Sequence, residues 1–264
     1  MKDPRLKRRS PVSHQQLVMP RLTAGIASPE LAEHLLSASA PRKDTDRMLE
    51  FRMSKARAKK IKLLLFDVDG VLTDGKIWIF PAPAGAQLST QEHAAEHSGQ
   101  GGFGFASQTY VEAKGFNAHD GTAISLARLA GIKMGLITKR ISETVALRAR
   151  DLKLEHVHQG IQDKRTVFEE ILAQEGLQPE EAAYVGDDVI DLPVMRNCGL
   201  AVAVPNAREE VKDEAHFITD HAGGDGALRD AVEYILKAQG KWDQVVEEYI
   251  SERSPKKVDS WREQ

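Results

Sequence analysis

Apolar runs alternate with amphipathic segments along most of this chain. Five runs have the length and composition of buried strands, at residues 61–66, 132–137, 156–158, 182–185 and 200–204. Helical spacing of apolar residues fills the intervals between them, at about 120–131, 142–150, 163–175 and 187–195. Strands that alternate with helices predict an α/β fold, here a Rossmann-like, doubly wound parallel sheet.

Two further segments have the alternating pattern of a β-hairpin that follows the first strand. Residues 76–80 and 108–114 carry aromatic or β-branched side chains, and the stretch between them is rich in Pro, Ala, Gly, Ser and His. We therefore expect a hairpin flap over residues 76–114 with a long flexible tip. The tip contains a formal G-x-G-x-x-G from Gly99 to Gly104, but no predicted strand precedes it, which argues against a dinucleotide site.

The two ends of the chain differ in composition from its middle. Residues 1–57 are expected to form a basic, largely disordered arm with a possible short helix, residues 58–240 one α/β domain, and residues 241–264 a helical tail. Residues 1–60 contain fourteen Lys or Arg and six Asp or Glu, whereas the remainder contains 22 and 33. A solvated arm is the main expectation, and a tether to nucleic acid or membrane is the open alternative. If translation starts at Met48 or Met53, most of this arm is not made.

Composition narrows the class of protein. A chain of 264 residues with 41% hydrophobic residues suits a globular protein, and its apolar runs are too short to span a membrane. The basic N-terminus is not followed by the apolar core of a secretory signal. One cysteine, Cys198, excludes an internal disulfide and fits a reducing cytoplasm, and we interpret it as a small buried apolar residue.

Polar residues follow several of the predicted strands at the point where each strand ends. They are Asp67, Asp69, Thr138, Lys164 and Asp187. Because the carboxyl ends of parallel strands share one edge of a sheet, we expect these residues to line one crevice. Crowded acids repel one another unless a cation or a shared proton relieves them. Mg²⁺ prefers oxygen ligands, for which Asp67, Asp187 and a main-chain carbonyl would suffice.

This set of side chains is suited to the transfer of a phosphoryl group. Asp67, last on its strand, is the predicted nucleophile that forms an aspartyl phosphate. Asp69 is the predicted general acid for the leaving alcohol and then the base for the attacking water. Lys164 balances the charge of nucleophile and phosphate, and Thr138 donates a hydrogen bond to a phosphoryl oxygen.

Four of these elements resemble, in order, the signature motifs of the haloacid dehalogenase superfamily of aspartate phosphatases. The matching positions are Asp67–Gly70, Thr138, Lys164 and Gly186–Asp191. The segment between Thr138 and Lys164 is too short for a cap domain, which is typical of the capless subclass. The resemblance implies a Mg²⁺ cofactor bound by Asp67, Asp69 and Asp187, with Asp188 and Asp191 in supporting positions.

Longer matches are similar to the phosphatases of 3-deoxy-D-manno-octulosonate 8-phosphate, a family of lipopolysaccharide precursor synthesis. These matches lie at residues 67–75, 116–121, 184–195 and 222–227. The resemblance implies release of phosphate from that sugar acid and a homotetramer in which hairpins meet. It also implies that substrate is bound by Asn117, Asp120, Gly121, Thr138, Lys139, Arg140 and Lys164.

Three positions depart from that family. Lys139 replaces a usual glycine, His119 replaces a common arginine, and Asp225 stands where a basic residue is frequent. These departures leave open a nonulosonate 9-phosphate or another sugar phosphate as the substrate. A catalytically retired domain that serves oligomerisation is the other alternative, although the retention together of Asp67, Asp69, Lys164 and Asp187 argues against it.

Overall fold

The computed structural model of this protein describes residues 52–85, 103–104 and 109–253. The chain divides into two units, residues 1–43 and 44–264, and every described residue lies in the second. Most of the predicted basic arm, most of the hairpin tip and residues 254–264 lie outside the described residues.

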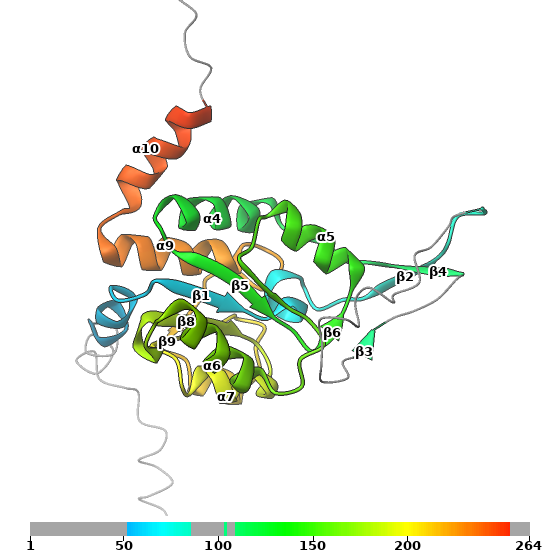
Figure 1. The fold of residues 1–264 in the computed structure, drawn as a ribbon, viewed down its shortest axis with the longest axis horizontal. Helices are drawn as coiled ribbons and strands as arrows, with labels where there is room; N and C mark the ends of the chain where they lie inside the picture. Colours follow the sequence, from blue (N-terminus) through cyan, green and yellow to red (C-terminus); the bar gives the residue numbers. More distant parts are fainter. Residues whose placement is uncertain (1–51, 86–102, 105–108, 254–264) are drawn as a thin grey trace, which may run out of the picture. The chain divides into compact units, whose positions relative to one another are not determined.

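One six-stranded parallel sheet forms the centre of the described structure (Figure 1). Its strand order is β10-β9-β8-β1-β5-β7, and every pair of neighbouring strands within it is parallel. The strands are β1 (Leu63–Phe66), β5 (Lys133–Ile137), β7 (His156–His158), β8 (Ala182–Gly186), β9 (Leu200–Ala203) and β10 (Phe217–Ile218). Both β1 and β8 are buried along their whole length, as strands covered on both faces must be. The predicted doubly wound sheet is confirmed.

Helices cover both faces of this sheet (Figure 1). On one side lie α4 (Ala118–Leu129), α5 (Glu143–Asp151), α9 (Ala227–Gln239) and α10 (Trp242–Arg253). On the other lie α6 (Lys164–Glu175) and α7 (Leu192–Met195). The shorter helical segments are η2 (Pro179–Glu181), η3 (Val189–Asp191) and α8 (Glu209–Asp213). Side chains of Asn117, Ser142 and Asp163 cap the first turns of α4, α5 and α6, which explains where these helices begin.

The strand order changes direction at β1. From β1 the chain proceeds through β5 to β7 on one side, and then returns to β8, β9 and β10 on the other. Such a reversal opens a crevice beyond the carboxyl ends of the two strands that flank it, here β1 and β8. The chain leaves β1 through a single kinked turn, η1 (Val68–Leu72), in which Asp69 and Gly70 have non-helical dihedral angles.

The predicted hairpin is present and extends away from the sheet (Figure 1). Strands β2 (Trp78–Pro81) and β4 (Tyr110–Ala113) pair antiparallel, with Trp78 opposite Ala113. A contact that the sequence did not predict joins the tip to the body: β3 (Phe103–Gly104) pairs parallel with β6 (Arg140–Ile141). The hairpin therefore approaches the crevice from the side of β5.

Both ends of the described chain pack on the body. Residues 52–58 are helical, and the hydroxyl groups of Ser54 and Tyr234 lie 2.5 Å apart, while Arg57 donates to the carbonyl of Gly199 at 2.9 Å. The boundary predicted at residue 57 thus falls inside a packed helix. Helix α10 contacts α4 and α9 and buries Val245.

The described part of the chain has no helix of the length and apolarity that crossing a bilayer requires. The interpretation of Cys198 is confirmed, because its thiol is buried and hydrogen-bonded to the carbonyl of Met195 at 3.4 Å. Burial raises the pKa of this thiol to about 12, so it stays protonated at neutral pH.

Candidate active site

Three carboxyl groups and one ammonium group meet at the crevice beyond β1 and β8. Asp67 follows β1 directly, Asp187 follows β8, and Asp191 ends the turn η3. One carboxylate oxygen from each of these three residues lies within 4.8 Å of the other two. Lys164, the first residue of α6, reaches the same point. The predicted convergence of Asp67, Lys164 and Asp187 is therefore present.

Lys164 joins two of these carboxylates in the interior of the protein. Its Nζ atom lies 2.8 Å from Oδ2 of Asp67 and 2.8 Å from Oδ1 of Asp191, and the residue is only 2% exposed. Burial disfavours its charged form, but the two carboxylates outweigh that effect and raise the pKa of the ammonium group. Lys164 is therefore a permanent buried cation paired with Asp67 and Asp191.

The three carboxylates carry more negative charge than one lysine can balance. Burial raises the pKa of Asp187 to about 8, and the nearby charges of Asp67 and Asp191 add to the effect. Burial likewise raises the pKa of Asp67 to about 6, although Lys164 opposes the shift. These shifts record a local excess of negative charge that a further cation would relieve.

Asp187 offers a ligand atom for such a cation. Its Oδ1 atom is buried and has no hydrogen-bond partner among the described residues. Buried carboxylate oxygens without a partner are strongly disfavoured, and oxygen ligands in an acidic cluster suit Mg²⁺. The side chains of Asp67 and Asp187 fit a magnesium site, with Asp187 Oδ1 available to it.

Asp191 belongs to the support of the site. Its Oδ1 accepts hydrogen bonds from Lys164 and from the Tyr184 hydroxyl, each at 2.8 Å. Its Oδ2 accepts from the backbone N–H groups of Asp187 at 3.0 Å and Asp188 at 3.3 Å. With both oxygens occupied, Asp191 fixes the positions of Lys164 and Asp187. This agrees with the supporting position expected for it.

Asp188 is exposed, and among the described residues its side chain hydrogen-bonds only to the neighbouring backbone. Its side chain accepts from the backbone N–H of Val189 at 2.7 Å and caps the turn η3. It supports the loop that carries Asp187 through the backbone rather than through a contact with the carboxylate cluster.

Gly70 fits closely against Asp187. It has a φ of 95°, and a Cβ atom at this position would lie 2.1 Å from Oδ2 of Asp187. The Gly70 carbonyl accepts from Asn206 Nδ2 at 2.9 Å, and Asn206 Oδ1 accepts from the Gly223 N–H at 2.8 Å. Asn206 thus ties the turn after β1 to the Gly223 loop, a role that the sequence reading missed.

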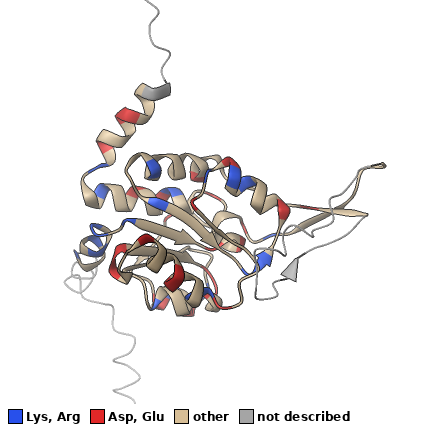
Figure 2. Ribbon diagram, in the orientation of Figure 1, with Lys and Arg blue, Asp and Glu red and all other residues tan. Residues whose placement is uncertain are grey.

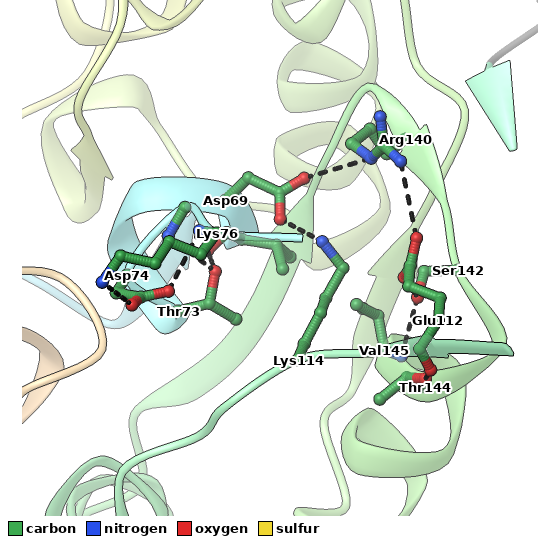
Figure 3. Close-up of polar contacts among 12 residues, drawn as sticks. Asp69, Thr73, Asp74, Lys76, Glu112, Lys114, Arg140, Ser142, Thr144 and Val145 are labelled. Atoms are coloured by element: carbon green, nitrogen blue, oxygen red, sulfur yellow. Dashed lines mark hydrogen bonds and ion pairs between the residues drawn. The ribbon is translucent and has the colours of Figure 1, made fainter. Parts of the chain in front are cut away.

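The side chain of Asp69 points toward Lys114 of the hairpin and toward Arg140 (Figure 3). Lys114, at the end of β4, donates to Asp69 Oδ1, and Arg140 Nε lies 3.6 Å from Asp69 Oδ2. Arg140 also lies 3.4 Å from Glu112, whose other oxygen accepts from the Ser142 hydroxyl at 2.6 Å. A chain of charged groups therefore connects Asp69 to the flap and to the segment after β5.

Lys114, Glu112 and Tyr184 are site residues that sequence reasoning did not single out. The Lys114 side chain is completely buried against Asp69. The sequence pattern predicted only that this residue ends one arm of the hairpin. Tyr184 lies inside an apolar strand and reveals its role only through its hydroxyl group. A charged residue at the last position of a predicted flap strand was the one available signal for Lys114.

Thr138 lies directly after β5 and is 3% exposed, at the same edge of the sheet as Asp67. Its backbone N–H donates to the carbonyl of His158 at 2.9 Å, which fixes the start of the loop. Lys139 and Arg140 follow it and are half-buried. The segment from Thr138 to Arg140 therefore borders the crevice.

Asp120, whose expected contact with substrate stays a prediction, has a structural role in this protein. Asp120 has no exposed surface, and its carboxylate accepts from the Arg229 N–H at 3.0 Å in the first turn of α9. Burial raises its pKa to about 6. Asp120 caps α9, whose own N-cap residue, Gly226, has no side chain to do so.

Asn117 and Gly121 also have structural contacts. Asn117 accepts from the His119 N–H at 2.7 Å and caps α4. A Cβ atom on Gly121 would lie 2.8 Å from the Arg148 guanidinium, so this glycine allows α4 and α5 to approach. Their expected contacts with substrate stay predictions.

Comparison with known proteins finds a matching family and similar phosphatases. A family model described as haloacid dehalogenase-like hydrolase matches residues 53–229. The 3-deoxy-D-manno-octulosonate 8-phosphate phosphatase KdsC of Escherichia coli is 37% identical over 189 residues, which cover 72% of this chain and 86% of that protein.

Solved structures of related phosphatases are also similar to this chain. A probable YrbI family phosphatase from Pseudomonas syringae is 38% identical with a TM-score of 0.62, covering 75% of this chain and 98% of that one. The 3-deoxy-D-manno-octulosonate 8-phosphate phosphatase of Moraxella catarrhalis, solved with magnesium, phosphate and a KDO molecule, is 32% identical with a TM-score of 0.62. That match covers 74% of this chain and 97% of the other.

The raised pKa values predict how the metal-free protein responds to pH. Because the pKa of Asp187 is about 8 in the folded state and 3.8 is its ordinary value, the folded protein holds a proton that the unfolded chain releases. The free energy of unfolding should therefore fall as pH rises from about 5 to 8, by up to ~1.4 kcal/mol per pH unit for one group. Asp67 acts in the same direction up to its pKa of about 6.

Urea unfolding in EDTA at several pH values measures this slope. Asp187→Asn should flatten it, and saturating Mg²⁺ should reduce it in the unaltered protein, because the cation replaces the proton. A metal-free protein that becomes more stable than the Asp187→Asn variant as pH rises from 5 to 8 would contradict the charge assignment.

Proposed function

Because this chain belongs to the haloacid dehalogenase-like hydrolase family, we propose that it is a magnesium-dependent phosphatase of 3-deoxy-D-manno-octulosonate 8-phosphate. The observation that carries the proposal is the convergence of Asp67, Lys164 and Asp187, with Asp187 Oδ1 buried and unpaired within the described residues. The products are the free sugar acid and inorganic phosphate, which assigns the protein to lipopolysaccharide precursor synthesis.

The metal would be held by Asp67, Asp187 and the main-chain carbonyl of Asp69, and when bound it would neutralise charge on the phosphoryl oxygens. A carboxylate oxygen of Asp67 attacks phosphorus, and the bond from phosphorus to the sugar oxygen breaks. Lys164 stays beside the Asp67 carboxylate, where its charge offsets that of the incoming phosphoryl group. Thr138 donates a hydrogen bond to that group.

Asp69 handles the protons of both steps. It protonates the departing sugar oxygen, then takes a proton from the water that attacks the aspartyl phosphate, which releases phosphate and restores Asp67. In the structure Asp69 is paired with Lys114 and Arg140. We infer that the anionic substrate competes for these two cations, which leaves the Asp69 carboxyl group able to hold the proton it must deliver.

Lys114, Lys139 and Arg140 favour an acidic sugar phosphate. Lys114 and Arg140 reach the crevice from the flap and from the segment after β5, close to Asp69. A carboxylate on the sugar would meet cations there, whereas a neutral sugar would leave them without an added partner. A nonulosonate 9-phosphate carries the same two charged groups and is the competing substrate.

Phosphate release from a panel of sugar phosphates tests this function. With Mg²⁺, the octulosonate 8-phosphate should have the highest kcat/KM, above a nonulosonate 9-phosphate and a neutral hexose 6-phosphate. Asp67→Asn should abolish the phosphoenzyme, and Asp69→Asn should lower kcat by about 10²–10⁴.

Asp74→Asn is the matched control, because Asp74 lies in the same loop but is exposed and paired with Lys76 at 2.8 Å. This variant should keep nearly full turnover. Near-normal turnover by Asp67→Asn would refute the nucleophile assignment. A folded protein that hydrolyses none of these substrates would instead point to the retired oligomerisation domain.

We further propose that the protein is a cytoplasmic homotetramer assembled through its hairpins. The side chains of Trp78, Ile79, Phe80 and Tyr110 are 47–53% exposed. Successive strand residues face opposite sides, so both faces of the hairpin present apolar surface. A two-stranded hairpin is barely stable alone, and exposed apolar patches mark interfaces. Hairpins of neighbouring copies would cover one another, and Cys198 as the single cysteine suits the cytoplasm.

Light scattering after size exclusion tests this assembly. The unaltered protein should elute as a tetramer, and Trp78→Ser combined with Phe80→Ser should reduce its mass to that of smaller species. Leu147→Ser removes an equally exposed side chain from α5 and should leave the tetramer intact. A monomeric unaltered protein would contradict the proposal.

A further inference from the structure

A second cleft lies at the opposite edge of the sheet from the active site. It is bordered by Lys62, which precedes β1, whereas Asp67 follows that strand. Its volume is about 830 Å³, within the range of small-molecule sites. Six lysines line it, from the helix at 52–58, the segment between that helix and β1, the end of α9 and the turn that follows α9. They are Lys55, Lys59, Lys60, Lys62, Lys237 and Lys241. Figure 2 shows Lys and Arg on these elements.

The positive charge of this cleft is only partly balanced. Among the described residues of its lining, Glu181 is the one acid, and it is paired with Lys62 at 2.6 Å. Lys237 is paired with Glu233, outside the lining, at 2.7 Å. Lys55, Lys59 and Lys60 are exposed, and no carboxylate of the described residues pairs with them. Lys59, just after the helix, donates its backbone N–H to the carbonyl of Lys55 at 3.2 Å, so their like charges lie one turn apart and repel each other. An anion in the cleft would remove this repulsion.

The walls of the cleft are fixed in place. Gln239, near the end of α9, donates from Nε2 to the carbonyls of Ala58 at 3.3 Å and Ile61 at 2.8 Å. These bonds join α9 to the end of the helix at 52–58. Lys241 donates to the Ala130 carbonyl at 3.2 Å and holds the following turn against α4. A cleft formed in advance binds a ligand without the loss of entropy that ordering its walls would bring.

We propose that this lysine cleft is a binding site for a small, multiply charged phosphorylated metabolite, separate from the active site. The ammonium groups of Lys55, Lys59 and Lys60, which no carboxylate of the described residues pairs, suit phosphate oxygens, to which each can donate charge-assisted hydrogen bonds. The volume accommodates a ligand of the size of a nucleotide or a phosphorylated sugar.

The distribution of charge favours a compact ligand over a nucleic acid. Residues 61–264 contain 22 Lys or Arg and 33 Asp or Glu, so the body around the cleft is acidic. A polymer that extended beyond the cleft would meet this surface and be repelled. A compact anion concentrates its charge beside the lysines that line the cleft.

Calorimetric titration with inorganic pyrophosphate in EDTA at low ionic strength tests the proposal, since EDTA removes metal-dependent binding at the active site. We expect saturable binding that weakens about tenfold or more in Lys55→Gln combined with Lys59→Gln, because two charge-assisted contacts are lost. The matched control, Lys153→Gln with Lys212→Gln, removes the same charge from residues outside the lining of the cleft and should bind within about twofold of the unaltered protein.

Three results would overturn the proposal. The first is the absence of saturable binding, and the second is equal binding by the lysine cleft variant and its control. The third is tighter binding of a single-stranded 20-nucleotide DNA than of pyrophosphate with the same dependence on Lys55 and Lys59, which would make the cleft a nucleic-acid site. Arg140→Gln should leave pyrophosphate binding unchanged, which distinguishes this cleft from the active site whatever the activity of the enzyme.

Discussion

The buried ion pairs of Lys164 hold the site of this protein together. The ammonium group of Lys164, a residue that is 2% exposed, bridges Asp67 and Asp191 at 2.8 Å each. Asp187 lies beside them with an oxygen that no described residue pairs. Removing one partner from a buried ionic group leaves an uncompensated charge and costs about 3–5 kcal/mol. The cluster is therefore satisfied only as a whole, with the lysine on one side and a divalent cation on the other. This requirement explains why residues from β1, η3, α6 and β8 must meet at one point.

The parallel pairing of β1 and β8 brings these residues together. Strands β1 and β8 are neighbours in register, with Phe66 opposite Val185, so the residues that follow them emerge side by side. The Asp67 N–H donates to the Val185 carbonyl at 3.0 Å and extends the ladder into the site itself. Asp191 then couples the two halves, because it binds the Lys164 ammonium group and the backbone of Asp187 together.

The sequence was sufficient for the parts of the site that follow from strand ends. Asp67, Thr138, Lys164 and Asp187 each come directly after an apolar strand or open the following helix, and parallel topology brings such positions together. Lys114 was missed because its contact with Asp69 depends on the angle at which the hairpin approaches, which periodicity does not encode. The capping contact of Asp120 was missed for a related reason: its partner is the first turn of α9, more than a hundred residues later in the chain.

A crystal structure with Mg²⁺ and beryllium fluoride, a mimic of the phosphoryl group, tests the central claim most directly. The account predicts beryllium bonded to the Asp67 carboxylate, magnesium in contact with Asp67 and Asp187, and Lys164 still paired with Asp191. Beryllium fluoride on Asp69, or magnesium bound away from Asp187, would contradict it.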